Sequence, residues 1–568
     1  MHSLHYITLC MLNEKRGIIA LGDINKQTFL HGALILMVAN IIVKIIGLIF
    51  RIPIYHQIGG EGWSYYQTAH TLYVYFFSIA TAGLPIAISK MISIANMEQN
   101  YEEEKRIFRL SLFIFITLGI IVTSSMIGAA RFFAEAVAVI PEAYYSILVF
   151  APALFFVCLT ASFRGYFHGK QNMIPTAISE VIESLGKLLI GLGAVLYAIS
   201  RGYELYIVAA FAMSGLTVGV VGGFIFLSIT KFISGRRESK RREKESAQIQ
   251  QRKFKIAPRS NKEILREIIK IALPITLSAS LIRLSAVVDT FVMVRRLIAA
   301  GYTEEAARTA FGDYSAQAVT IFNFPNVLII PFAVSIIPVL SQHFASKNKM
   351  AIQSTVESTF RVVSIISMPC AFGIASLSVP ILSLMFVDRV AVAATAPLLS
   401  VLALSVVFVS IAAVTNSMLQ AQGQERKTVI STGCGILVKL VSSYILVGIP
   451  EIGRFGVPIG TFLLYFTVTA MNFYFLVKYT GIVPPIRRTF MKPFMASAIM
   501  AICTILIYMF LNNMMNGSRI ATLLAILVGA VIYAILTLLF KTLKRDDVLL
   551  LPKGEKLYAA MKRKNLID

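Results

Sequence analysis

Residues 29–55 read FLHGALILMVANIIVKIIGLIFRIPIY. A helix needs about 20 mostly apolar residues to cross the hydrocarbon core of a bilayer. This stretch is longer than that and contains only two strongly basic side chains, Lys44 and Arg51. It therefore predicts a transmembrane helix that carries two cations. A cation at the bilayer centre costs at least about 2.5–3.5 kcal/mol, so both side chains require a reason for their position.

Similar apolar stretches recur along the whole chain. The 568 residues are 57% hydrophobic and 14% charged, whereas soluble proteins are about 25% charged. This composition excludes a soluble enzyme and, for the chain as a whole, a nucleic-acid-binding protein. We predict an all-α polytopic membrane protein with about 14 transmembrane helices. After 29–55, the expected spans are 66–94, 107–130, 143–167, 175–199, 204–230, 265–296, 315–341, 357–386, 392–420, 428–449, 455–478, 490–512 and 518–540.

The basic residues predict the orientation. The net charge is +24. If successive loops lie on opposite sides of the membrane, forty Lys and Arg residues fall on one side and eight on the other. Cytoplasmic loops carry the excess of Lys and Arg. We therefore expect both termini in the cytoplasm and an even number of helices.

A polar stretch from Lys231 to Lys262, with RRESKRREKESAQIQQRK at its centre, separates six helices from eight. It is either a solvated linker or a contact with anionic lipid headgroups. The two halves resemble repeats, since VKIIGLIFR in the first segment aligns with IRLSAVVDT in the seventh. The predicted domains are a cytoplasmic tail 1–28, an N-lobe 29–230, a basic linker 231–264, a C-lobe 265–478, two extra helices 479–540 and a basic tail 541–568.

Four cations lie near the middle of predicted segments. Lys44 and Arg283 occupy matching positions of segments one and seven, and Lys187 and Lys439 occupy matching positions of segments five and eleven. Their side chains are too far from the interface to reach it. Each is either half of a structural ion pair or part of a cation-lined cleft. The repeat symmetry favours a cleft that binds an anionic substrate.

A gate is expected where segments one and seven reach the outer side. Arg51 follows Lys44 by two helical turns on the same face, and Asp289 lies in the outer half of segment seven. We predict that Arg51 and Asp289 form an ion pair across the cleft. The alternative is that each anchors its own helix at the interface.

Segment five carries two carboxylates on the face of its cation. Glu180, Glu183 and Lys187 follow an i, i+3, i+7 spacing. Either Glu183 neutralises Lys187, or the carboxylates are proton- or cation-responsive groups that serve coupling. The corresponding residues 432–438 of segment eleven are uncharged. We therefore expect Lys187 to be paired and Lys439 to be unpaired.

The sequence contains no pattern for catalysis or for a metal. Its five cysteines are far apart, no GxxxxGK[ST] run occurs, and no Ser, His and Asp residues group as a triad. We expect no catalytic residue, no metal site and no cofactor. The expected energy source is a coupling monovalent cation or the membrane potential.

Several motifs resemble one known family. RGYFHGKQNMIPTAIS (residues 164–179) is the most specific, and GLIFRIPIYHQIGGEGWSYYQ (47–67), TAGLPIAISKMIS (81–93) and DDVLLLPKGEKL (546–557) accompany it. Together they resemble the SpoVB/YtgP branch of the MOP flippase superfamily, which includes the MurJ-like lipid II flippases. The chain departs from the Gram-negative MurJ-like proteins, which carry an arginine early in segment two and another in segment eight. Here YVYFFSIATAG (73–83) has no cation, and Gln317 stands near the second arginine's place.

The resemblance implies a MOP/MATE-like fold with two lobes around a V-shaped cavity. It also implies a non-enzymatic flippase of the bacterial cytoplasmic membrane that acts as a monomer. Its partners would be the bilayer and a lipid-linked anionic saccharide, not nucleic acid. The cargo would be an undecaprenyl-diphosphate-linked saccharide, with lipid II as the first choice. We expect Lys44 and Arg283 to contact the diphosphate, with Arg51, Lys187 and Lys439 as further substrate-binding cations.

Three other functions remain open from the sequence. The first is a flippase for another repeat unit, such as teichuronic acid or capsule. The second is a cation-coupled multidrug exporter of the same superfamily, for which an acidic cavity is expected. The third is a membrane-embedded glycosyltransferase or ligase, which needs catalytic carboxylates on large outside loops. The longest such loop, 297–314, carries only Glu304, Glu305 and Asp313.

Overall fold

The computed structural model describes residues 29–98, 100–246, 260–515 and 518–542. No strand occurs in these ranges. The longer helices are α2 (Phe29–Met97), α3 (Tyr101–Arg131), α4 (Ala143–Gly169), α5 (Ile174–Ser200), α6 (Leu205–Ser246), α7 (Asn261–Ala299), α10 (Asn326–Ala345), α11 (Lys349–Ser376), α13 (Arg389–Ala421), α14 (Glu425–Val447), α15 (Gly456–Thr480), α16 (Lys492–Met514) and α17 (Arg519–Leu539). The shorter elements are η2 (Phe132–Ala138), α8 (Glu304–Asp313), η3 (Tyr314–Ala318), α9 (Val319–Phe322), α12 (Ser378–Met385), η4 (Gly453–Phe455) and η5 (Arg487–Met491).

The prediction of an all-α polytopic membrane protein is confirmed. Thirteen helices of the described chain are long and apolar enough to cross a membrane. The first of them, α2, contains two predicted segments, 29–55 and 66–94, joined without a loop. The chain turns between them at Gly59, whose φ of 64° is open to glycine at little cost. The thirteen candidate helices therefore account for the fourteen predicted segments.

Segment eight differs from the prediction. The expected single helix 315–341 is interrupted, and the chain instead forms α8, η3 and α9, a break at residues 323–325, and then α10. Pro325 stands at the start of α10. A proline disfavours helical geometry in the residue before it, which explains why the helix stops there. The break leaves α9 free to contact the other lobe.

The predicted linker and tails are described only in part. Residues 231–246 continue α6 as a helix, so the first half of the expected linker is helical. Residues 247–259 lie outside the described part of the chain. The predicted tail 1–28 also lies outside it, as does the tail 541–568 except for its first two residues.

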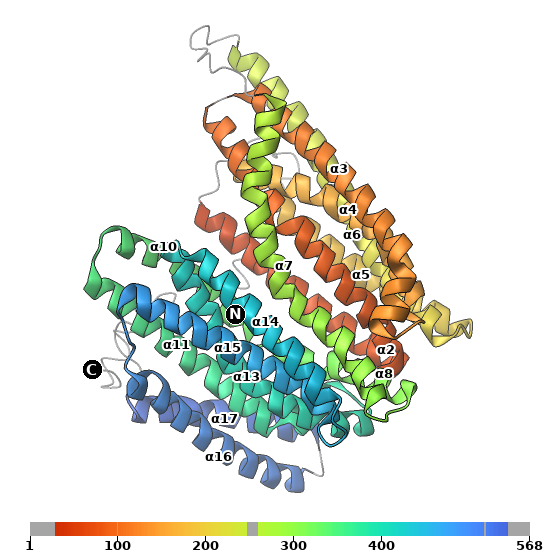
Figure 1. Ribbon diagram of the computed structural model, residues 1–568, viewed down its shortest axis with the longest axis vertical. Coiled ribbons are helices and arrows are strands. Elements are labelled where there is room, and N and C mark those ends of the chain that lie inside the picture. Colours follow the sequence, from red (N-terminus) through yellow and green to blue (C-terminus); the bar gives the residue numbers. More distant parts are fainter. Residues whose placement is uncertain (1–28, 99, 247–259, 516–517, 543–568) are drawn as a thin grey trace.

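The helices form two lobes (Figure 1). Helices α2 to α6 make up one lobe, and α10 to α15 make up most of the other, with α16 and α17 along its outer side. Helix α7 connects them, because it packs against α2 in the first lobe and against α14 in the second. The lobes also meet at one end of the molecule, where α8 packs against α2.

Glycines set the close packing of α5 on α6. Gly215, Gly219 and Gly223 recur at every fourth residue of α6 and lie against the α5 backbone and the Glu183 side chain. A side chain at Gly219 would collide with the carbonyl oxygen of Glu183. Small residues at such intervals let membrane helices approach closely. This contact fixes the part of α5 that carries Glu183 and Lys187.

Candidate functional site

Two of the predicted cavity cations lie near each other. Lys44 on α2 and Arg283 on α7 are both exposed at the protein surface, and they are close enough to repel one another. Neither side chain has a hydrogen bond or an ion pair with any described residue. The packing of α2 on α7 therefore brings together two unneutralised positive charges from matching repeat positions.

Arg51 connects the two lobes. Its Nη1 atom donates a hydrogen bond to Thr320 Oγ1 on α9, and its Nη2 atom lies 3.5 Å from Gln67 Oε1. Its guanidinium also lies over the Trp63 ring, 5.1 Å from the ring centre. The expected Arg51–Asp289 pair is not formed. The guanidinium is held instead by Thr320, just before the break in segment eight, and by Gln67 and Trp63 of its own helix α2.

Asp289 pairs with Lys439. The Lys439 ammonium donates to Asp289 Oδ2 at 2.8 Å and to Ser285 Oγ at 2.9 Å. The Lys439 side chain is 1% exposed and that of Asp289 is 15% exposed. The expectation that Lys439 is unpaired was therefore wrong. It considered only the uncharged neighbours of Lys439 on its own helix, whereas the counter-charge comes from α7.

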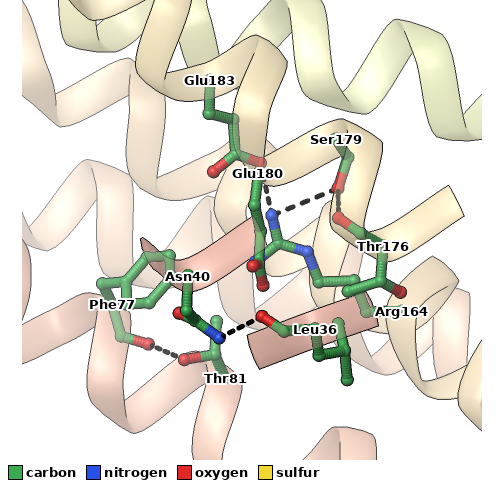
Figure 2. A network of polar contacts seen from close by, with 9 residues as sticks. All are labelled: Leu36, Asn40, Phe77, Thr81, Arg164, Thr176, Ser179, Glu180 and Glu183. Atoms are coloured by element: carbon green, nitrogen blue, oxygen red, sulfur yellow. Dashed lines mark hydrogen bonds and ion pairs between the residues drawn. The ribbon is translucent and has the colours of Figure 1, made fainter. Parts of the chain in front are cut away.

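Glu183 pairs with Arg164 rather than with Lys187 (Figure 2). Arg164 Nη2 lies 2.6 Å from Glu183 Oε1, and Arg164 Nη1 lies 3.9 Å from Glu180 Oε1. Ser179 Oγ accepts a further contact from Arg164 at 3.4 Å. In Figure 2, the arginine from α4 lies between the two carboxylates of α5. The expected Glu183–Lys187 pair was therefore wrong as well.

Sequence analysis missed Arg164 by counting it among the cytoplasmic loop charges. Its side chain is only 9% exposed. A signal was available, because the predicted span 143–167 already contained this arginine. A cation inside a span needs a partner, and two carboxylates follow it within twenty residues.

Lys187 has an aromatic environment. Its ammonium lies 4.8 Å from the centre of the Phe50 ring and 5.7 Å from that of the Tyr66 ring. No described carboxylate lies within ion-pair distance of it. Of the two repeat-related lysines, Lys439 is therefore the paired one and Lys187 the unpaired one, which is the reverse of the expectation.

A third polar group, Tyr55, Asp313 and Gln317, joins the lobes where α8 packs on α2. We call it the α2–α8 latch. Tyr55 Oη donates to Asp313 Oδ1 at 2.6 Å, and Gln317 Nε2 donates to Tyr55 Oη at 2.7 Å. The backbones of Gly60 and Gly312 touch beside it, so neither position has room for a Cβ atom. Sequence analysis named Gln317 and Asp313 separately but did not connect them with each other or with Tyr55.

The latch is expected to respond to pH. Burial raises the pKa of Asp313 to about 6, and this effect outweighs the hydrogen bond from Tyr55, which lowers it. When the latch opens to water, the pKa should fall toward its usual value of about 3.9. The closed latch thus binds the proton more tightly. Acidification from pH 7 to pH 5 should stabilise the closed latch by about 1–3 kcal/mol, and this stabilisation should be lost as the pH rises through 6.

Cysteine labelling at Ser315, which is buried beside the latch, tests this expectation. Ser315→Cys should react with a maleimide more slowly at pH 5 than at pH 7, beyond the change caused by thiol chemistry. The same cysteine combined with Asp313→Asn corrects for that chemistry. If the labelling rate depends on pH in the same way with Asp313 and with Asn at position 313, the latch does not respond to the protonation of Asp313.

Comparison with known families adds to this geometry. Residues 29–344, more than half of the chain, match the family described as "Polysaccharide biosynthesis protein". The chain belongs to the polysaccharide biosynthesis protein family. Residues 315–445 of this family member also match the MatE family. Both matches, together with the relatives below, place it in the SpoVB-like branch of the MOP flippase superfamily, as its motifs predicted.

Two similar relatives come from Bacillus subtilis (strain 168). Stage V sporulation protein B is 26% identical over 535 residues, which cover 93% of this chain and 98% of the relative. Lipid II flippase MurJ is 24% identical over 519 residues, covering 88% and 93%. The structure titled "Lipid II flippase MurJ, inward closed conformation" aligns with a TM-score of 0.66 at 16% identity, covering 89% and 98%. This last likeness confirms the fold, and the family member is a multi-pass bacterial membrane protein.

The site of this family member suits anions better than metals. Among the described residues, no group of three or more His, Cys, Asp or Glu side chains is placed to hold a metal ion. The unpaired side chains Lys44, Lys187 and Arg283 are all cationic. Such groups bind phosphate and carboxylate oxygens.

Proposed function

We propose that this protein translocates an undecaprenyl-diphosphate-linked saccharide, with lipid II as the preferred cargo, from the inner to the outer leaflet by alternating access. The observation that carries the proposal is the Lys44–Arg283 pair of cations, which have no counter-charge in the described structure. Because no described carboxylate neutralises these two positive charges, they are available to bind the negative charges of a diphosphate. The saccharide is moved without a covalent change.

Physical chemistry supports a diphosphate at this position. A lipid-linked headgroup loses hydration of its phosphates when it enters the membrane, and nearby cations offset that loss. Arg283 can bind two phosphate oxygens with its planar guanidinium, while Lys44 acts as a point charge. The relative named lipid II flippase MurJ is similar over nearly its whole length, which supports lipid II as the cargo of this protein too.

The other predicted site residues take different roles in this proposal. Lys439 is held by Asp289, so it binds substrate only in a conformation that releases Asp289. We assign this pair to gating. Glu180 and Glu183 share one arginine, and we assign them to coupling with a proton or a monovalent cation. The predicted N-lobe 29–230 and C-lobe 265–478 are the two bodies that would move.

The proposed orientation places both termini and the 231–264 linker in the cytoplasm. It rests on the forty-to-eight division of basic residues between the two sides. In that orientation the membrane potential drives an anionic headgroup outward, with about 2.3 kcal/mol per charge at 100 mV. Cysteines placed at positions 245 and 516 should label from the inside and the outside, respectively. Outside labelling at 245 in intact cells would reverse the orientation.

Substitution of the two unpaired cations tests the function. The Lys44→Ala, Arg283→Ala double variant should slow lipid II flipping in proteoliposomes by at least about 100-fold, because each charge-assisted contact contributes about 1.5–3 kcal/mol. Lys349→Ala, which removes an exposed cation outside the site, is the control and should flip normally. Arg283→Lys should retain more activity than Arg283→Ala if charge dominates over bidentate geometry.

Two results would contradict the proposal. Normal flipping by the double variant would show that Lys44 and Arg283 do not bind the diphosphate. Export of cationic dyes by the wild-type protein, without lipid II flipping, would favour the multidrug exporter suggested by the MatE match. An export site for cations would need acidic groups in place of Lys44 and Arg283.

A further inference from the structure

A second group of basic side chains lies inside the first lobe, around three aromatic rings. Arg51 lies over Trp63, and Lys187 lies over Phe50 and Tyr66. His70 stacks on Tyr66, with 5.5 Å between ring centres and an angle of 18°. Arg51, Lys187 and His70 are close enough to repel one another. All three are half-buried, so they remain within reach of a ligand.

This group has no acidic partner. The charged groups that act on Arg51, Lys187 and His70 include no described carboxylate. Glu183, one turn before Lys187, is held by Arg164. Two basic side chains, Arg51 and Lys187, are thus kept in membrane-spanning helices without a carboxylate partner, and a positive charge there is costly unless an anion binds.

Two buried donors beside these cations also have no partner. The Tyr66 hydroxyl and the Trp63 indole nitrogen form no hydrogen bond with any described residue, and both residues are 1% exposed. An indole N–H can only donate. Buried polar groups in native proteins are nearly always satisfied. An acceptor placed among the three basic groups would satisfy both donors.

We propose that Arg51, Lys187 and His70, with the Tyr66 hydroxyl and the Trp63 indole, form a second anion subsite that receives a carboxylate of the transported headgroup. The inference rests on the proposed flippase function and adds a requirement for an acidic headgroup. A carboxylate accepts about four hydrogen bonds and carries one charge, which suits a site whose Arg51 already uses two donors on Thr320 and Gln67.

The subsite is separate from the diphosphate contact. Neither Lys44 nor Arg283 is among the groups that act on Lys187 or His70. Arg51 follows Lys44 by seven residues, about 10 Å along the helix. One elongated headgroup can therefore place its diphosphate at Lys44 and Arg283 and a carboxylate beside Lys187.

Binding of two headgroups to the full-length protein in nanodiscs tests the subsite. One ligand is a polyprenyl-diphosphate-linked saccharide peptide with free carboxylates, and the other is its methyl ester. The wild-type protein should bind the ester at least about tenfold more weakly. Lys187→Met should abolish this difference, and Lys187→Arg should keep it. A difference that persists in folded Lys187→Met protein overturns the proposal.

Lys44→Met separates this test from that of the flippase function. It should weaken both ligands equally and leave their ratio unchanged. Failure of polyprenyl diphosphate itself to bind the wild-type protein would refute the flippase function instead. Tyr66→Phe removes only the unpartnered hydroxyl and should reduce the preference for the acid over the ester by about threefold. This variant replaces Lys187→Met in the test if Lys187→Met does not fold.

A small free anion presents the same chemistry as a headgroup carboxylate. Thermal unfolding of lipid-free protein in acetate, chloride and phosphate distinguishes the two sources. The headgroup assignment predicts little stabilisation by these ions. Strong stabilisation of the wild-type protein but not of Lys187→Met, together with equal binding of acid and ester, would overturn the headgroup assignment in favour of a free anion.

Discussion

Arg164→Met is expected to lower the free energy of unfolding by about 3–5 kcal/mol, because it leaves Glu180 and Glu183 buried without a counter-charge. Arg164 is itself buried, and its guanidinium lies 2.6 Å from Glu183 and 3.9 Å from Glu180. The two carboxylates thus depend on the same arginine. The loss of stability is measured by heating the protein in detergent and following the fraction that stays folded by size-exclusion chromatography.

Restoring the charge balance provides the control. Glu183→Gln combined with Arg164→Met should recover part of the lost stability, since it removes one of the two uncompensated charges. The rescue distinguishes an electrostatic loss from a simple packing defect. If the double variant is less stable than Arg164→Met alone, the arginine stabilises the lobe by packing and not by charge.

The two repeat-related lysines are expected to respond in opposite ways. Lys439→Met should destabilise the protein by about 3–5 kcal/mol, because Asp289 loses its buried partner. Lys187→Met, a change of similar volume, should cost less than about 1.5 kcal/mol, since no described carboxylate depends on Lys187. Removing its unpaired charge can even raise stability. Parallel unfolding curves of the two variants measure the contrast.

Asp289→Asn is the matching rescue for Lys439→Met. The double variant should unfold at a higher temperature than Lys439→Met alone, whereas Glu183→Gln should not rescue either lysine variant. Equal losses for Lys187→Met and Lys439→Met would show that the pairing seen in the structure does not govern stability.

Hydrophobic length predicted most of the helices because each crossing needs its own apolar stretch. It did not predict the break before α10, because that break depends on Pro325 inside an otherwise apolar run, whereas the turn at Gly59 falls in the gap left between the first two predicted segments. The apolar stretches that predicted the helices also revealed the cations near their middle. Lys44 and Lys187 stand out because a charge in such a run is rare.

The partners of these cations could not be predicted from local spacing. The i, i+4 rule paired Glu183 with Lys187, but Arg164 from the neighbouring helix reaches the carboxylate instead. Asp289 and Lys439 are 150 residues apart in the chain, and only the packing of α7 on α14 brings them together. Sequence repeats located the charged positions, whereas tertiary contacts decided which of them remain available for a ligand.

The touching backbones of Gly60 and Gly312 have a mechanical consequence. Contacts between side chains can loosen gradually, because rotamers adjust as two helices separate. The contact between the Gly60 and Gly312 backbones includes no glycine side chain that could adjust in this way. This end of the molecule therefore closes only where no side chain stands between the two backbones. A methyl group at Gly60 would collide with Asp313 and Thr309 of α8, and one at Gly312 would collide with Gly60 of α2, so either would hold the two helices apart.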